Sequence, residues 1–345
     1  MPRRTALLVG INYRGTADEL NGCYNDVVNV ATYLRTVLGY APAAITMLTD
    51  GNRGSAFPAS VAPTRQNILA GLSALVAGIA SGDEAVFHFS GHGTLVRDTN
   101  GDEVSGMDSC LCPLDYNAPA SAGGGVITDD EIRALLVNRV PRGARLYVIL
   151  DCCHNGTGCD IRYKYEDFSV LLRPPSARTA PLWRTQQKAM VQGKYTETVG
   201  DVYMISGCRD EQTSADAYIN NAFAGALTYA VFAILRANQA SIRTYSWSAL
   251  LRDVRYFMRV NRYDQIPQIM TGQLITPAAA VFPGLAAVKR GVGGGGSLEL
   301  GIGSVSAPGG NRGIAVEAPT TTTLFGFKPK PKSGANTRQA IQFLH

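Results

Sequence analysis

The stretch VILDCCHNGTGCD, residues 148–160, joins an apolar run to Asp-Cys-Cys-His and then to a turn that contains glycine. A continuous apolar run of this kind is typical of a strand buried on both faces of a parallel sheet. In open parallel sheets, ligands bind outside the carboxyl ends of the strands. An apolar strand that ends in an aspartate and two cysteines therefore predicts an α/β fold with reactive groups at this strand end.

Apolar runs and amphipathic stretches alternate along the rest of the chain. Strands are expected at 5–11, 44–48, 85–89, 145–150 and 202–206, and helices at 25–38, 64–79, 128–140, 221–237 and 247–260. Such alternation indicates a mostly parallel sheet with helices on both faces. Two long segments, 93–127 and 161–200, interrupt it and are expected to be either functional loops or disordered segments.

The composition excludes several classes of protein. The chain has 345 residues, of which 46% are hydrophobic and 17% are charged, as in a globular protein. No apolar run approaches the ~20 residues of a membrane span and the start does not form a signal peptide, so we expect a cytoplasmic protein without membrane contact. The seven cysteines follow no small-scaffold spacing, which favours reduced thiols.

The net charge of +5 lies in the C-terminal tail. From residue 285 onward there are seven Lys or Arg residues and two Glu residues, whereas basic and acidic residues are balanced before that point. The body of the protein has no basic excess for phosphates, so we expect no nucleic-acid partner. The tail, 286–345, is rich in Gly, Pro, Thr and Lys and is expected to be flexible.

Two strands are expected to end in reactive side chains. The third strand ends in FSGHG and the fourth in LDCCHNG. Because side chains alternate along a strand, Ser90 and His92 share one side of the sheet, and Asp151 and Cys153 share one side. If these strands are neighbours, they bring a thiol, an imidazole and a carboxylate together, while Cys152 points the other way.

We expect Cys153 to be a nucleophile and His92 to be its base. A free thiol is mostly protonated at neutral pH and needs a neighbouring imidazole to become a thiolate. The backbone N–H groups of Gly93 and Cys153 are expected to bind the oxyanion that forms during acyl transfer. The alternatives are a buried core cysteine at 153, or a zinc site among the cysteines, for which no CxxC pair is present.

Seven stretches resemble, in family order, the motifs of the metacaspases, which belong to the caspase-like clan of cysteine peptidases. They are ALLVGINYRG, LNGCYNDV, FHFSGHGT, GMDSCLCPLD, ITDDEI, VILDCCHNG and VYMISGCRDEQTSADA, and they span about residues 5–270. The resemblance implies a caspase-like three-layer sandwich with a mostly parallel six-stranded sheet. It also implies a His92–Cys153 dyad that cleaves protein or peptide substrates. The family's His-Ser-Gly is His154-Asn155-Gly156 here.

The resemblance further implies an acidic specificity pocket. The positions that match it are Cys23, Asp26, Ser90 and Asp151. Two carboxylates around one pocket favour a guanidinium and penalise an acidic side chain, so cleavage is expected after Arg or Lys.

A second set of carboxylates matches the family's calcium site. It contains Asp108, Asp129, Asp130 and Asp160. Hard cations bind several carboxylate oxygens, so Ca²⁺ is the expected cofactor and activator. The alternative is that the charges at 129 and 130 only complement the dipole at a helix start.

The chain is expected to contain four segments. Residues 1–160 form a large-subunit-like catalytic portion, 161–200 a basic linker, 201–285 a small-subunit-like portion and 286–345 the tail. An enzyme specific for Arg or Lys would be able to process itself within the linker. The candidate cleavage positions are Arg162, Lys164, Arg173, Arg178, Arg184, Lys188 and Lys194. We expect a monomer that lacks an N-terminal prodomain.

Two other classes of function remain open. A catalytically silent protein of the same fold would bind partners without cleaving them. A metal- or polyanion-binding protein would depend on the cysteines or on the tail. Peptide cleavage that is lost with Cys153 would exclude the first class, whereas zinc that is retained on purification, or binding that is lost with the tail, would favour the second.

Overall fold

A computed structural model gives the fold of the protein. It describes residues 2–51, 61–99, 101, 106–152, 159–167, 183–187, 196–207, 216–219, 222–276 and 278–282. The chain divides into two units, Met1–Leu285 and Ala286–His345, and the described residues all lie in the first unit.

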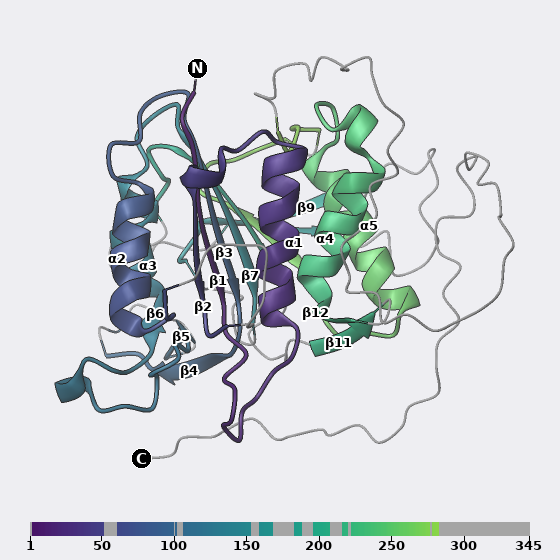
Figure 1. The fold of residues 1–345 in the computed structure, drawn as a ribbon. Coiled ribbons are helices and arrows are strands. Elements are labelled where there is room, and N and C mark those ends of the chain that lie inside the picture. Colours follow the sequence, from purple (N-terminus) through teal and green to yellow (C-terminus); the bar gives the residue numbers. More distant parts are fainter. Residues whose placement is uncertain are drawn as a thin grey trace, which may run out of the picture. The chain divides into compact units, whose positions relative to one another are not determined.

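The central sheet has eight strands rather than the predicted six (Figure 1). In sheet order they are β2 (Ile45–Thr49), β1 (Arg4–Gly10), β3 (Glu84–Ser90), β7 (Arg145–Asp151), β10 (Asp201–Ser206), β13 (Gln268–Thr271), β8 (Tyr163–Asp167) and β9 (Trp183–Gln187). The first five strands run parallel, and β13, β8 and β9 are each antiparallel to the strand before them. The sheet is therefore mostly parallel up to β10 and antiparallel beyond it.

The two additional strands, β8 and β9, come from the segment that we interpreted as a basic linker. β8 reads YKYED, in which Tyr163 and Tyr165 are buried and Lys164 between them is half-buried. This alternation of aromatic and charged side chains is typical of a half-buried strand. The predicted linker therefore contains two strands, which we did not predict because four residues of alternation are easily overlooked in a polar segment.

Helices cover both faces of the sheet, which confirms the predicted α/β sandwich (Figure 1). The helices are α1 (Cys23–Thr36), α4 (Ala226–Ala237) and α5 (Trp247–Val260) on one face, and α2 (Arg65–Leu75) and α3 (Asp129–Leu135) on the other. Alternating side chains of β1 supply both cores. Leu8 packs with α1 and α4, whereas Leu7 and Val9 pack with α2.

We expected residues 93–127 to form a loop, but they also contain short strands. Within them, β4 (Gly93–Arg97) pairs with β5 (Met107–Leu111), and β5 pairs with β6 (Ile127–Thr128). A second small sheet, β11 (Asp216–Ile219) and β12 (Ala222–Gly225), precedes α4. This hairpin occupies the first residues of the helix predicted from 221, so α4 begins at Ala226.

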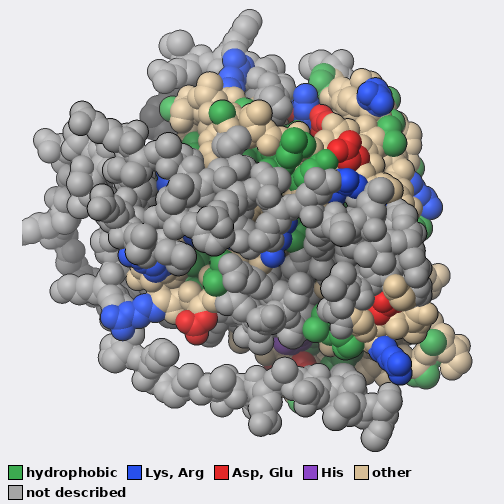
Figure 2. All heavy atoms as spheres, turned by 180° about the vertical axis from the view of Figure 1, so that it is seen from behind, with side chains coloured by type: hydrophobic (Ala, Val, Ile, Leu, Met, Phe, Trp, Pro, Cys, Tyr) green, Lys and Arg blue, Asp and Glu red, His purple; other side chains and the backbone are tan. Residues whose placement is uncertain are grey.

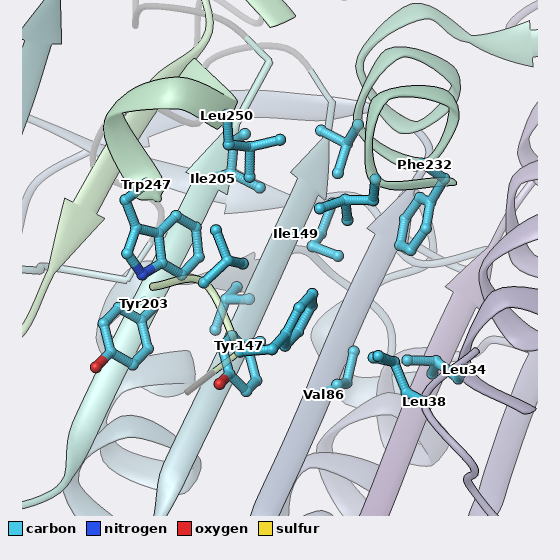
Figure 3. A pocket seen from close by; sticks show the side chains of 15 residues that line it. Leu34, Leu38, Val86, Tyr147, Ile149, Tyr203, Ile205, Phe232, Trp247 and Leu250 are labelled. Atoms are coloured by element: carbon cyan, nitrogen blue, oxygen red, sulfur yellow. The ribbon is translucent and has the colours of Figure 1, made fainter. Parts of the chain in front are cut away.

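The last described residues close one of the cores. The Trp247 backbone N–H donates to the Ala279 carbonyl, and the Val281 N–H donates to the Tyr245 carbonyl. Phe282 then packs among α1, α4, α5 and the sheet, beside an apolar cavity of about 30 Å³ (Figure 3). A cavity of this size has room for only a few water-sized groups, and its lining is apolar.

The surface charges and the helices of the described residues match what the amino-acid composition predicts. On the face in Figure 2, the basic and acidic side chains of the described residues are interspersed and do not gather by sign. No helix in the described part of the chain is long and apolar enough to cross a lipid bilayer.

Candidate active site

Three parallel strands end side by side at the predicted site. In the sheet register, Gly10 of β1 lies opposite Ser90 of β3, and Ser90 lies opposite Asp151 of β7. The Gly91 N–H continues this alignment, because it donates to the Asp151 carbonyl at 3.4 Å. The two strands predicted to carry the dyad are thus neighbours. His92 is described, whereas Cys153 and His154 lie outside the described residues.

The His92 side chain has a defined tautomer. Its Nε2 atom lies 2.7 Å from the backbone carbonyl oxygen of Asp18. A carbonyl oxygen only accepts hydrogen bonds, so Nε2 must carry a proton. In the neutral imidazole, Nδ1 then has the lone pair and is the atom able to accept a proton. The loop before α1 supplies this contact, which no local signal in the sequence indicated.

Two buried carboxylates meet at the amino terminus of α4. Asp26 and Asp151 are 0% and 3% exposed. Asp26 accepts the Ser90 hydroxyl at 2.7 Å and the Gly225 N–H at 2.9 Å. Asp151 accepts the Thr228 N–H at 2.8 Å. The free N–H groups and the positive end of the α4 dipole therefore stabilise two negative charges that would otherwise be costly to bury.

Gly225 is the point at which the two carboxylates converge. A Cβ atom at this position would lie 2.3 Å from Asp151 Oδ2 and 2.7 Å from Asp26 Oδ2. Any side chain there would have to displace both charged groups. The structure thus brings together three of the four predicted pocket residues, Asp26, Ser90 and Asp151. The fourth, Cys23, is buried at the start of α1, and its backbone N–H donates to Oδ1 of Asn12.

A neutral histidine lies behind this acidic pair. His88 is fully buried on β3, and its Nε2 atom is 3.1 Å from the Thr228 hydroxyl. Burial lowers the pKa of His88 from 6.5 to about 3. The imidazole therefore adds no positive charge beside Asp151. Gly225, Thr228 and His88 were not predicted, because only the fold brings α4 to β3 and β7.

The four predicted calcium ligands lie on three segments. Asp108 is on β5, Asp129 and Asp130 begin α3, and Asp160 follows β7 with a left-handed φ of 49°. Asp129 and Asp160 are 0% exposed. Burial raises the pKa of the Cys159 thiol well above its usual value, and the negative charges of Asp160 and Asp129 raise it further. Cys159 therefore lies within electrostatic reach of both carboxylates.

The donor chemistry of these carboxylates suits a hard cation, but the structure does not gather them as ligands. Among the described residues, which include all four, no three His, Cys, Asp or Glu side chains are placed to hold a metal ion. Part of the reason is local, since Asp129 accepts the N–H groups of Ser109 at 3.1 Å and Asp130 at 3.2 Å. Arg133 is also buried here and donates to the Asp160 carbonyl and, at 3.0 Å, to the Thr196 carbonyl.

The cysteines in the described part of the chain are buried free thiols. They are Cys23, Cys110, Cys112, Cys152 and Cys159. Cys152 is 0% exposed and packs on the α2 and α3 face, whereas Asp151 contacts α4 on the other face. This arrangement confirms that the chain alternates faces at the end of β7, as predicted.

Comparison with known proteins assigns the family. The family model described as "Metacaspase, peptidase C14 domain" matches residues 4–162. Metacaspase-1 of Mycosarcoma maydis is 36% identical over 301 residues, which cover 79% of this chain and 71% of the relative. Metacaspase-1 of Yarrowia lipolytica is 34% identical over 295 residues, and the match spans 77% of this chain but only 61% of that protein.

A solved structure has a similar fold. The crystal structure of protein GSU0716 from Geobacter sulfurreducens has a TM-score of 0.52 and 25% sequence identity, and the match covers 80% of this chain and 96% of that one. The chain belongs to the metacaspases, a family of cysteine-type endopeptidases.

Proposed function

We propose that this chain is a cysteine endopeptidase that cleaves after Arg or Lys, with Cys153 and His92 as its dyad. The observation that supports it most is the acidic pair, because Asp26 and Asp151 converge at Gly225 beside the strand ends that lead to His92 and Cys153. A substrate guanidinium or ammonium group would neutralise two buried charges there. An acidic side chain would add a third negative charge and be excluded.

The chemistry follows the tautomer of His92. Nδ1 of His92 takes the proton of the Cys153 thiol, and the thiolate attacks the scissile carbonyl carbon. The oxyanion accepts hydrogen bonds from the N–H groups of Gly93 and Cys153. When the C–N bond breaks, His92 returns the proton to the leaving amine. Water, deprotonated by His92, then releases the acyl group and restores the thiol.

Matched peptides test this function. Fluorogenic substrates that differ only in a terminal Arg, Lys or Asp should be cleaved after Arg and Lys but not after Asp, and Cys153→Ala should abolish cleavage. Cleavage after Asp would refute the proposed pocket. No cleavage of any peptide by folded protein, with millimolar Ca²⁺ present, would instead favour a catalytically silent protein that acts by binding.

We also propose that Ca²⁺ binds the carboxylates of Asp108, Asp129, Asp130 and Asp160, which would have to move together to form the site. Bound calcium would neutralise buried negative charge and tie the segment after β7 to the start of α3. Titration calorimetry with Ca²⁺ should give heat for the wild type and much less for Asp129→Asn. Asp83→Asn, at the opposite end of the sheet, is the control and should bind as the wild type does. Equal binding by all three proteins, or no binding, would refute this site.

Self-processing is the third part of the proposal. Lys164 pairs with Met270 on one side and Gln186 on the other, and Arg184 pairs with Glu166. A protease needs an extended, unpaired strand of substrate, so cuts at these two positions would require the β8–β9 pairing to open. We therefore expect processing at the remaining candidates, of which Arg173, Arg178, Lys188 and Lys194 lie outside the described residues.

A monomeric state and a cytoplasmic location complete the proposal. Sedimentation of the purified protein, and fractionation of cells that express it, test these two expectations separately from catalysis.

A further inference from the structure

The imidazole of His92 is held by the side chain of Tyr13. The two ring centroids are 4.7 Å apart, with an angle of 37° between the ring planes. The Tyr13 hydroxyl accepts the backbone N–H of His92 at 2.9 Å and donates to the carbonyl of Cys112 at 2.5 Å. The Cys112 N–H in turn donates to the His92 carbonyl at 3.0 Å. One phenol therefore contacts the imidazole ring and fixes the backbone that carries it.

A second tyrosine holds the carbonyl that His92 contacts. The hydroxyl of Tyr116 donates to Oδ2 of Asp18 at 2.6 Å. The Asp18 backbone carbonyl accepts from His92 Nε2 at 2.7 Å. Tyr116 also meets the ring of Tyr13 edge-on, with centroids 6.1 Å apart. The loop before α1 is thus attached to the loop after β5 at the residue that selects the His92 tautomer.

The backbone around Tyr13 is specialised for this contact. Tyr13 is 1% exposed and has a φ of 50°, a value that costs energy for a residue other than glycine. Gly91 lies over its hydroxyl, and a Cβ atom at 91 would come within 2.9 Å of that oxygen. Burial also raises the pKa of the phenol well above 10.0, so the hydroxyl keeps its proton and remains a donor. Backbone strain of this kind persists only where the surroundings enforce it.

We propose that Tyr13 and Tyr116 are positioning residues for His92. Tyr13 fixes the plane of the imidazole, and Tyr116 fixes the Asp18 carbonyl that keeps the proton on Nε2. Neither side chain needs to touch the substrate. The inference rests on the proposed function, because it assigns both tyrosines to the proton transfer at Nδ1.

Single hydroxyl deletions test it, with Tyr33 as a matched control. Tyr33 is 0% exposed, and within the described residues its hydroxyl has no hydrogen-bond partner. Tyr13→Phe loses two neutral hydrogen bonds, and Tyr116→Phe loses one hydrogen bond to a carboxylate. Each should lower kcat by about tenfold, with KM unchanged. Tyr33→Phe should change neither constant. An equal kcat in all four proteins, or a change in KM alone, would overturn the inference.

Coupling between Tyr116 and Asp18 separates positioning from a general loss of structure. Asp18→Ala keeps the carbonyl that His92 uses but removes the carboxylate that Tyr116 holds. It should match Tyr116→Phe, and the double variant should be no slower than either single one. Additive losses would mean that Tyr116 acts by another route. If Tyr13→Phe does not fold, this pair of variants still decides the Tyr116 part.

A measurement without a peptide substrate tests the role of Tyr13 independently of the proposed peptidase function. The rate at which iodoacetamide alkylates Cys153 at pH 6, followed by mass spectrometry, reports thiolate formed with His92. It should fall in Tyr13→Phe towards the rate of His92→Ala and stay unchanged in Tyr33→Phe. If the wild type cleaves no peptide, the proposed function fails, while these rates alone decide the role of Tyr13. Equal rates in the wild type and Tyr13→Phe would refute it.

Discussion

Replacing Asp151 with asparagine removes one of the two charges of the proposed specificity pocket and leaves an oxygen acceptor in place. The amide oxygen of asparagine is still able to accept the Thr228 N–H that now bonds Oδ2 at 2.8 Å. The same change at Asp26 would also disturb hydrogen bonds. Both carboxylate oxygens of Asp26 accept hydrogen bonds, from Gly225 and Ser90, and the NH₂ group of an asparagine would face one of these donors. Asp151→Asn therefore removes the charge and keeps an acceptor for the Thr228 N–H.

The size of the effect follows from what the substrate loses. A charge-assisted hydrogen bond to a buried carboxylate contributes about 1.5–3 kcal/mol, which is a factor of roughly 10–150 in rate or affinity. The charge of Asp26 remains, so the pocket still prefers a cation. We expect kcat/KM for an Arg peptide to fall about 30-fold, with most of the change in KM.

Citrulline provides the matched substrate. It has the shape of arginine without the positive charge, so the ratio of kcat/KM for Arg to that for citrulline should fall by the same factor in Asp151→Asn. The thermal midpoint of the variant, measured in parallel, checks that it is folded. An unchanged ratio in folded protein would refute the reasoning that this carboxylate recognises the cation.

Three further predictions concern stability and the identity of the nucleophile. The pKa of His88 is about 3 in the folded protein against 6.5 when exposed, so the folded state binds fewer protons. The protein should therefore lose stability as pH falls from about 6.5 towards 3. His88→Gln should flatten this dependence of the thermal midpoint on pH. Phe282→Ala should enlarge the apolar cavity and lower the free energy of unfolding by about 3 kcal/mol in urea titrations, whereas a cost below about 1 kcal/mol would show that this end of the chain does not close the core. Cys152→Ala should keep peptidase activity and lose only about 1 kcal/mol of stability, whereas Cys153→Ala should keep stability and lose activity.

The sequence predicts best the elements whose signals are local. The helix expected at 247–260 has these bounds in the structure, since Ser246 caps it with its hydroxyl and one face is apolar. The neighbouring strands β3 and β7 also follow from apolar runs. β8 and β4 were missed, because a strand of five residues with polar members becomes recognisable only once its pairing partners are known.

The same distinction applies to the site. Asp26, Ser90 and Asp151 were found from motifs, and the structure brings them together. Gly225 and Thr228 were not, because they follow Asp26 by about two hundred residues and act through backbone N–H groups, which any residue type except proline provides. The Asp18 carbonyl is invisible in the sequence for the same reason. Contacts that backbone atoms make with residues far away in the sequence are therefore seen only once the fold is known.

The position of α4 has a consequence for how this protein can be divided. The acidic pair belongs to residues before β8, whereas Gly225 and Thr228, which hold it, come after β9. Two separately produced fragments, one ending after β8 and the other starting before β9, would each contain half of the proposed specificity pocket. Strand β10 of the second fragment would have to pair with β7 of the first before the two halves could bind a cation together. Fused to two interacting proteins, such fragments would form a protease whose activity reports their association.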